Sequence, residues 1–278
     1  MSVYYIDGRF TKKDEIRISI DDRGYYFGDG VYEVIQVYNG QLFTMKEHVE
    51  RLFKSAAKIN LTLTYTEQEI NELALALIEK NQLVNGHVYM QVTRGVSERQ
   101  HHFPSPAVPA VLTAYAVTTD RPAEDMKQGV AVKTMPDIRW LRCDIKSLNL
   151  LGSVLAKQEA KEAGFAEAML HRDGVVTEGS STNMFGIKDG IVRTHPVNHL
   201  ILEGITRKVV LALCDELNIP VEEKAFTVEE ALNMDEVFYT STTSEVMPII
   251  RIDDKIIGDG KSGALTKKLQ AAFTMKTP

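Results

Sequence analysis

The sequence contains little cysteine: Cys143 and Cys214 are the only two among 278 residues. Two cysteines are too few for a disulfide framework, and they lack the clustered spacing of a zinc site. The sequence also has no His-Glu-x-x-His arrangement and no Gly-x-Ser-x-Gly segment that would present a nucleophilic serine. We therefore expect reduced core thiols and no bound metal, and we disfavour metalloenzymes and serine hydrolases.

An excess of basic residues is absent as well. Lysine and arginine number 32 against 38 acidic residues, and the formal net charge is -6. No basic surface of the kind that holds a nucleic-acid backbone is expected. No apolar run approaches the roughly 20 residues that cross a bilayer, and residues 1–10 lack the basic start and apolar block of a signal peptide. These patterns predict a cytoplasmic protein that binds neither nucleic acid nor membrane.

Dipeptides that favour tight turns separate short β-prone segments in the first half. Asp7-Gly8 and Asn39-Gly40 tolerate positive φ and predict two hairpins. The strands expected in this half cover residues 3–6, 9 onward, 31–38, 41–44, 87–94 and 109–117.

Two Ser/Thr-x-x-Glu patterns predict helices between these strands. Thr44 with Glu47, and Thr66 with Glu69, have the spacing of a capping box, and each pair precedes apolar residues at offsets of three and four. The second helix is expected to stop near Asn85-Gly86, a typical C-terminal cap.

A polar stretch at residues 118–129, which contains Pro122, separates two patterned halves. We therefore predict an N-terminal α/β domain at 1–118, a linker at 119–129 and a C-terminal domain at 130–278. Hairpins outnumber alternating strand–helix units, which favours an α+β fold with largely antiparallel sheets and flanking helices. In the second half the expected strands are 130–135, 166–170, 183–187 and 191–195, and the expected helices are 150–163, 205–217 and 263–273.

Lys146 is a candidate nucleophile because apolar Ile145, Leu148 and Leu150 surround it in the sequence. Desolvation favours the neutral amine, and a neutral amine can attack an aldehyde to form a Schiff base. Taken alone, Lys146 is better explained as a surface lysine whose charged amine reaches water.

Three polar segments could surround a ligand. Residues 177–183 combine Glu178 with four hydroxyls. Residues 202–207 open a helix whose free N–H groups can bind an anion, and residues 240–244 are five consecutive hydroxyl residues. Each has an ordinary explanation by itself, as a solvated turn, a helix start or a polar loop.

Together these segments resemble the fold-type IV pyridoxal-phosphate aminotransferases, from about Tyr4 to Phe273. Residues 22–33, 47–52 and 177–180 match family signatures in order and spacing. The resemblance implies a two-domain enzyme in which Lys146 holds pyridoxal phosphate (PLP) covalently and Glu178 faces its pyridine nitrogen. It also implies that Leu202 packs on the ring, and that the phosphate binds Arg51, the N–H groups of Ile205 and Thr206, and the Thr242 hydroxyl. An ion pair with Glu47 or Glu50 is the plain alternative for Arg51.

Residues 93–101 are most similar to the D-amino-acid aminotransferase family, in which Arg-x-His and a tyrosine hold the substrate carboxylate. Here those residues are Arg99, His101 and Tyr32. The resemblance implies a homodimer in which Arg99 and His101 come from the neighbouring subunit. It further implies ping-pong transfer from D-alanine to 2-oxoglutarate.

Other functions remain open on the same fold. A branched-chain L-aminotransferase or an aminodeoxychorismate lyase would keep Lys146 and Glu178, but the Arg99-x-His101 pattern argues against both. A binding protein without catalysis is disfavoured because candidates for all three cofactor contacts are present. The sequence assigns no role to His102 beside the motif.

Overall fold

The computed structural model describes residues 2–278 of the chain. The chain divides into two compact units. Unit 1 contains the residues through Asp120, together with Ile145–Asn149 and Pro278, and unit 2 contains Arg121–Asp144 and Leu150–Thr277.

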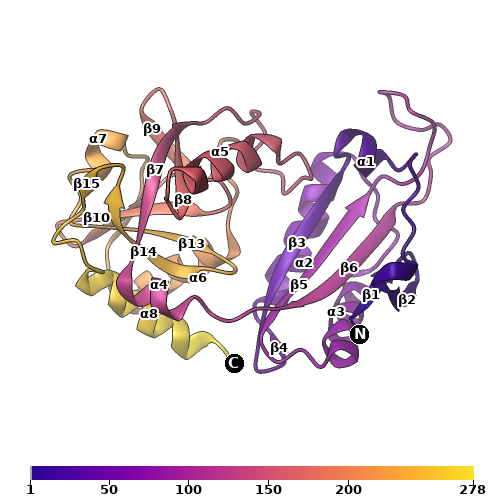
Figure 1. The fold of residues 1–278 in the computed structure, drawn as a ribbon, viewed down its shortest axis with the longest axis horizontal. Coiled ribbons are helices and arrows are strands. Elements are labelled where there is room, and N and C mark those ends of the chain that lie inside the picture. Colours follow the sequence, from indigo (N-terminus) through magenta and orange to yellow (C-terminus); the bar gives the residue numbers. More distant parts are fainter. Residues whose placement is uncertain (1) are drawn as a thin grey trace. The chain divides into compact units, whose positions relative to one another are not determined.

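Unit 1 is built on a six-stranded antiparallel sheet with the order β2-β1-β6-β5-β3-β4 (Figure 1). Positive φ at both residues of Asp7-Gly8 and of Asn39-Gly40 confirms the two predicted hairpin turns. The strands are β1 (Val3–Ile6), β2 (Arg9–Lys12), β3 (Gly30–Tyr38), β4 (Gln41–Leu42), β5 (Gly86–Thr93) and β6 (Val111–Thr118).

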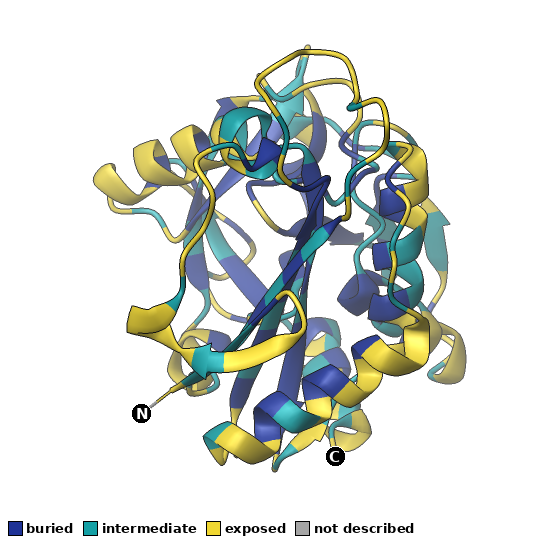
Figure 2. Cartoon of the chain, turned by 90° about the vertical axis from the view of Figure 1, so that its right-hand side faces the viewer, coloured by how far each residue is buried: buried dark blue, intermediate teal, exposed yellow. Residues whose placement is uncertain are grey.

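Two long helices, α2 (Met45–Lys58) and α3 (Glu67–Asn81), pack on one face of this sheet (Figure 1). Their apolar faces and those of the strands form the core of unit 1, while the opposite helix faces are exposed (Figure 2). Two short helices, η1 (Lys13–Glu15) and α1 (Arg23–Phe27), precede β3.

The two predicted capping boxes behave differently. Thr66 accepts from the Glu69 N–H and the Glu69 side chain reaches back, so the box at α3 is confirmed. Thr44 is left-handed, with φ 53°, and its hydroxyl donates to the Phe43 carbonyl, so the box at α2 is wrong although the helix forms. The predicted end of α3 near Asn85-Gly86 is also wrong. The helix ends at Asn81, with the left-handed Gln82 as its C-cap, and Gly86 already belongs to β5.

Unit 2 contains a nine-stranded mixed sheet with the order β12-β11-β10-β13-β14-β7-β8-β9, and β15 pairs with β14. Neighbours β11 and β12, β14 and β7, and β7 and β8 are parallel, and the other pairs are antiparallel. The predicted α+β class is therefore confirmed. The strands are β7 (Val130–Pro136), β8 (Glu167–Arg172), β9 (Val175–Gly179), β10 (Asn183–Lys188), β11 (Ile191–Thr194), β12 (Val221–Glu223), β13 (Glu236–Ser241), β14 (Glu245–Ile252) and β15 (Lys255–Ile256).

Helices of unit 2 are interspersed with these strands. They are α4 (Ala123–Gln128), α5 (Leu151–Glu162), α6 (Ile205–Glu216), α7 (Val228–Ala231) and α8 (Ala264–Lys276). Within residues 2–278, none of the helices combines the length and apolar character needed to cross a membrane.

Three local predictions need correction. The stretch expected to be a linker contains α4, and Thr177, Glu178 and Gly179 end strand β9 rather than lying in a loop. The segment with Lys146 was expected in the C-terminal domain, yet it belongs to unit 1. It joins β3 because β4 covers only the far end of that strand: the Tyr32 N–H donates to the Lys146 carbonyl at 3.0 Å, and Ser147 bridges Val31.

Candidate active site

Lys146 is held in unit 1 by its backbone and by one aromatic ring. Its N–H donates to the Ser55 hydroxyl at 3.3 Å, and its neighbours Ile145 and Ser147 are both buried. The Lys146 Nζ lies 4.2 Å from the centroid of the Tyr32 ring, a favourable position for a cation. The structure thus brings together the predicted nucleophile and one predicted substrate residue, with the half-buried amine at a fixed place.

Arg51 belongs to a buried ionic cluster around Glu33. Arg51 donates to both carboxylate oxygens, from Nε at 2.7 Å and from Nη2 at 2.9 Å, and His48 Nδ1 lies 2.7 Å from Oε2. Burial raises the pKa of Glu33, but Arg51 and His48 outweigh it and hold that pKa well below its usual range. Burial also lowers the pKa of His48, although Glu33 opposes this. Arg51 is therefore oriented by its two hydrogen bonds to Glu33.

Arg99 and His101 lie on an exposed loop between β5 and β6 and meet at one ring. The Arg99 guanidinium is 5.1 Å from the centroid of Phe27, and the His101 ring is 5.5 Å from the same centroid. Phe27 ends the short helix α1, which Asp22 caps by accepting from the Gly24 N–H at 2.7 Å. The Phe27 ring therefore contacts both predicted carboxylate-binding residues, Arg99 and His101.

Glu178 is the centre of a second group of residues, in unit 2. Its carboxylate is buried and accepts from Arg139 Nη1 at 2.6 Å, Asn183 Nδ2 at 2.9 Å and the Leu202 N–H at 3.0 Å. Burial raises the pKa of Glu178 to about 7, and Arg139 limits the rise. Glu178 can therefore lose or keep a proton close to neutral pH.

The Arg139 guanidinium forms ion pairs with two acidic residues. Besides Glu178 it binds both oxygens of Asp137 at 2.9 Å, and Asp137 also accepts from Thr177 at 2.9 Å. Burial raises the pKa of Asp137, but these contacts bring it down to about 2. Asp137 is the stronger competitor for the guanidinium, so Glu178 has only part of a counter-charge.

Helix α6 begins at Ile205 with its first N–H groups available. Its cap residue is Gly204, which has no side chain to accept from them. A Cβ at Gly204 would lie 2.1 Å from Asn183 Oδ1, so this approach requires glycine. Asn183 also donates to the Leu202 carbonyl at 2.9 Å, which fixes Leu202 on both sides of its backbone.

Thr242 lies in the turn between β13 and β14. Among the described residues, no direct hydrogen bond joins it to Leu202, Ile205 or Thr206. Close by in the sequence, the buried Thr240 hydroxyl has no hydrogen-bond partner within the described part of the chain. Donors without a partner are what an oxyanion requires.

Sequence reasoning assigned no individual role to Glu33, His48, Arg139 or Asn183. Glu33 could have been found, because it interrupts an otherwise apolar row formed by Val31, Ile35 and Val37 on one face of β3. A charged residue in a core-facing row needs a buried partner. Arg139 carries no comparable local signal.

The residues described above offer the chemical groups that PLP needs. A phosphate needs N–H and O–H donors near positive charge, a pyridine nitrogen needs a carboxylate, and an aldehyde needs an amine. Between residues 2 and 278, no cluster of histidine, cysteine and acidic side chains could hold a metal ion.

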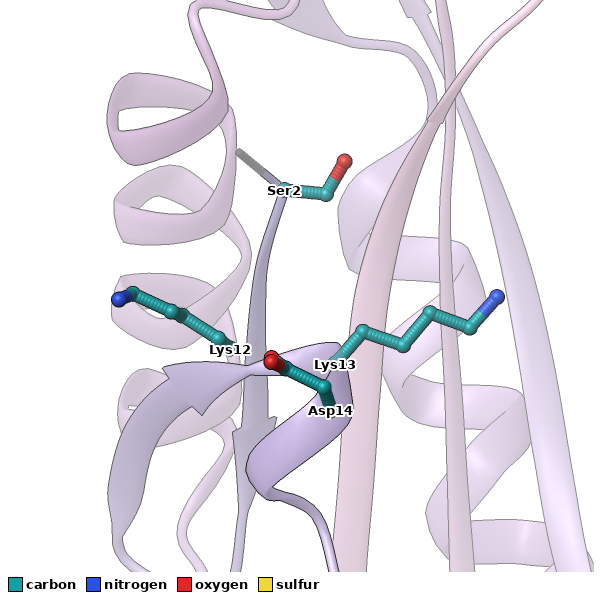
Figure 3. Close-up of a pocket in the computed structure, with 4 residues that line it drawn as sticks. All are labelled: Ser2, Lys12, Lys13 and Asp14. Atoms are coloured by element: carbon teal, nitrogen blue, oxygen red, sulfur yellow. The ribbon is translucent and has the colours of Figure 1, made fainter.

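A cavity of about 670 Å³ beside the N-terminal hairpin is unrelated to these groups. It is lined by Ser2, Lys12, Lys13 and Asp14. In Figure 3 the amines of Lys12 and Lys13 point to opposite sides and do not converge on one position. We assign no chemistry to this cavity.

Comparison with known proteins defines the class of enzyme. Residues 30–252 match the family model described as amino-transferase class IV. The chain belongs to this family and is a PLP-dependent transaminase. Curated relatives include the D-alanine aminotransferases of Staphylococcus epidermidis (strain ATCC 12228) and Bacillus licheniformis. They are 50% and 51% identical to this chain and cover 98% and 96% of it, and the matches span 97% and 94% of their own lengths.

Solved structures agree with the family. The branched-chain amino acid aminotransferase of Escherichia coli superposes with a TM-score of 0.94 at 26% identity, over 99% of this chain and 96% of that one. The branched-chain aminotransferase of the thermophilic archaeon Thermoproteus uzoniensis, solved with norvaline, superposes with a TM-score of 0.88 at 28% identity, over 99% and 94%. The predicted fold type is confirmed.

Proposed function

We propose that this transaminase moves the amino group of D-alanine and other D-amino acids to 2-oxoglutarate. The products are pyruvate, or another 2-oxo acid, and D-glutamate, formed in a ping-pong cycle. The observation that carries the proposal is the convergence of Arg99 and His101 on the Phe27 ring. The D-alanine aminotransferases that are about half identical to this chain support it.

Each predicted cofactor-binding residue is proposed to contact a particular part of the cofactor. Lys146 would bind it covalently, Glu178 would face the ring nitrogen and Leu202 would pack on the ring. Arg51, the N–H groups of Ile205 and Thr206, and the Thr242 hydroxyl would bind the phosphate. When bound, PLP supplies an aldehyde carbon and a ring that accepts electrons as the substrate loses its α-proton.

The protein supplies the proton transfers and the orientation. Lys146 Nζ would act as the base that removes the α-proton of the substrate. Glu178 is suited to a ring nitrogen because a carboxyl with a pKa of about 7 can share a proton with that nitrogen near neutral pH. Asn183 and the Leu202 N–H keep its second oxygen in place.

Substrate handedness is assigned to the carboxylate-binding residues. Tyr32, Arg99 and His101 would hold the α-carboxylate so that the α-hydrogen, rather than the side chain, points at Lys146 Nζ in a D-amino acid. We include in the proposal a homodimer in which Arg99 and His101 serve the neighbouring subunit's site.

The substrate test compares D-alanine with L-alanine in an assay that couples pyruvate formation to a visible signal, with 2-oxoglutarate as acceptor. D-alanine should be turned over and L-alanine should not. Equal rates for the two enantiomers would refute the proposed handedness.

The Lys146 test uses Lys146→Ala, with Lys54→Ala on the exposed face of α2 as the matched control. Lys146→Ala should lose the visible absorption of the bound cofactor and reduce turnover by orders of magnitude, because the covalent and basic roles vanish together. Lys54→Ala should keep both properties. Borohydride treatment of the wild type should leave a mass adduct on the peptide with residue 146, and an adduct elsewhere would contradict the assignment.

A branched-chain L-aminotransferase is the second candidate, and the likeness to the Escherichia coli enzyme favours it. The same assay format with L-leucine as donor separates the two. Turnover of L-leucine without turnover of D-alanine would select this alternative. An aminodeoxychorismate lyase would instead release pyruvate from aminodeoxychorismate, and it would need no 2-oxo acid acceptor.

A further inference from the structure

We propose that Arg23 is a positioning residue that fixes the backbone beneath Arg99 and His101 and so sets the affinity for the substrate carboxylate. The inference rests on the proposed function, because it assigns a purpose to the loop that carries these two residues. Arg23 itself would not touch substrate.

Arg23 binds three successive carbonyl groups of that loop. Its Nη1 donates to the Gln100 carbonyl at 2.7 Å and to the His102 carbonyl at 3.2 Å, and its Nη2 lies 3.5 Å from the His101 carbonyl. The Arg23 side chain is only 3% exposed, whereas residues 98–103 are exposed. A buried, planar donor group therefore holds the main chain of an otherwise solvated segment.

The loop needs such a contact because it has little structure of its own. It runs from the end of β5 at Thr93 to the start of β6 at Val111, without a helix or strand. Connections of this length are uncommon in compact domains and are flexible unless other residues restrain them. Without restraint, Arg99 and His101 would sample many positions, and ordering them would weaken substrate binding.

Arg23 is itself fixed to the rigid part of unit 1. Asp29 Oδ2 accepts from Arg23 Nε at 2.8 Å and from Arg94 Nε at 2.9 Å. Arg94 also donates to the carbonyls of Ile59 and Asn60, both at 2.8 Å, just beyond the end of α2. The loop carbonyls are thus connected through two buried guanidinium groups and one carboxylate to a core helix.

The start of the loop is held by the same segment of chain. The Arg23 N–H donates to the Gly95 carbonyl at 3.0 Å, and the Ser97 N–H donates to the Asp21 carbonyl at 3.1 Å. Gly95 has φ 97°, and a Cβ there would lie 2.0 Å from the Pro109 carbonyl oxygen, so the two ends of the loop approach closely. Helix α1 therefore contacts the loop by backbone at its start, by Arg23 at its middle and by Phe27 at the side chains.

The test measures KM and kcat separately for Arg23→Gln and Arg23→Lys. Arg23→Gln should raise KM for D-alanine and for 2-oxoglutarate by about 10- to 100-fold, which corresponds to about 1.4–2.7 kcal/mol of lost binding. Its kcat should stay within a few-fold. Arg23→Lys keeps the charge beside Asp29 but lacks the planar fork, so its KM should be intermediate. The visible spectrum and the PLP affinity should not change in either variant.

Hydrogen exchange gives a readout that does not depend on turnover. The amides of residues 98–103 should exchange faster in Arg23→Gln than in the wild type, while those of β3 and α2 should not change. Arg17→Gln is the matched control, because Arg17 also donates to two carbonyls, those of Asp14 and Ile16, but does so locally and on the surface. It should leave KM and exchange unchanged.

Arg99→Met separates this inference from the proposed function. If Arg99→Met raises KM while both folded Arg23 variants do not, the inference is overturned and the proposed function stands. If Arg99→Met leaves KM unchanged, the carboxylate-binding role fails, and the role of Arg23 fails with it. Should Arg23→Gln not fold, the KM of Arg23→Lys decides.

Discussion

Glu33 in unit 1 and Glu178 in unit 2 are two glutamates with almost the same burial and opposite acidity. Their side chains are 0% and 6% exposed. Burial raises the pKa of each, yet Glu33 stays well below its usual range whereas Glu178 reaches about 7. Burial alone therefore does not determine the state of these carboxyl groups.

The difference lies in how the neighbouring donors are shared. Arg51 and His48 both bind Glu33, and Arg51 does so through two hydrogen bonds. Arg139 gives Glu178 one hydrogen bond and gives Asp137 two from its guanidinium. A full counter-charge makes Glu33 a permanent anion that orients Arg51. Because Arg139 also pairs with Asp137, Glu178 keeps a pKa near neutral pH. Such a carboxyl group suits a partner for a ring nitrogen.

The largest effect is expected when Glu33 loses its charge. Glu33→Gln should lower the free energy of unfolding by about 3–5 kcal/mol, because removing one member of a buried ion pair leaves the other charge poorly compensated. Urea denaturation measures this. Glu50→Gln on the exposed side of α2 should change it by less than about 0.5 kcal/mol, because Glu50 makes an exposed pair with Lys54. Similar losses of unfolding free energy in Glu33→Gln and Glu50→Gln would show that the buried ion pair of Glu33 contributes no more than an exposed one.

Glu178→Gln should show the reverse pattern. We expect kcat/KM to fall by about 100- to 1,000-fold, the usual loss when an electrostatic partner of the reacting system is removed. At pH 5, where Glu178 is mostly protonated, the free energy of unfolding should change by about 1 kcal/mol or less, because glutamine can still accept from Asn183 and Arg139 keeps Asp137. Steady-state kinetics and urea denaturation of one preparation test both parts, and wild-type activity would contradict the role of Glu178.

The stability of the cofactor-free protein should depend on pH through Glu178. Its pKa rises from 4.5 to about 7 on folding, so between these values the folded state holds a proton that the unfolded state has lost. Stability should therefore fall as pH rises through this window, by roughly 3 kcal/mol in total. Denaturation curves at pH 5, 6 and 7 should show this fall in the wild type and lack it in Glu178→Gln. Glu33 acts oppositely: its contribution is complete above the usual glutamate pKa and is lost only in stronger acid.

The smallest effect is expected at Arg139. Because Arg139 lowers the pKa of Glu178, Arg139→Met should raise it and move the acidic limb of the kcat/KM profile to higher pH by about one unit. Activity at pH 7 should fall by about fivefold and recover towards pH 9. Arg139→Lys, which keeps a positive charge, should shift the limb less. An unmoved limb in both variants would show that Glu178 does not depend on this guanidinium.

Short-range patterns predicted the local elements well and failed where distant segments intervened. Asp7-Gly8 and Asn39-Gly40 form the expected turns because positive φ is a property of those residues. Thr66 and Thr44 have the same capping spacing, but only Thr66 caps its helix. Thr44 is in a left-handed conformation, and its hydroxyl donates to the Phe43 carbonyl instead. The spacing of Thr44 and Glu47 does not reveal this backbone conformation.

The sequence by itself determined the class of enzyme and the residue types that the chemistry needs: an amine at Lys146, a carboxylate at Glu178 and the Arg99-x-His101 pair. Residue order is enough for this because these groups stand in short contiguous segments. Only the tertiary structure decided that Lys146 joins the edge of β3 and that Arg51 is oriented by Glu33. It also decided that Arg139 pairs with both Asp137 and Glu178. Those outcomes depend on burial and on charges that are far apart in the chain, and the energy of a buried charge is set by whichever groups the fold places around it.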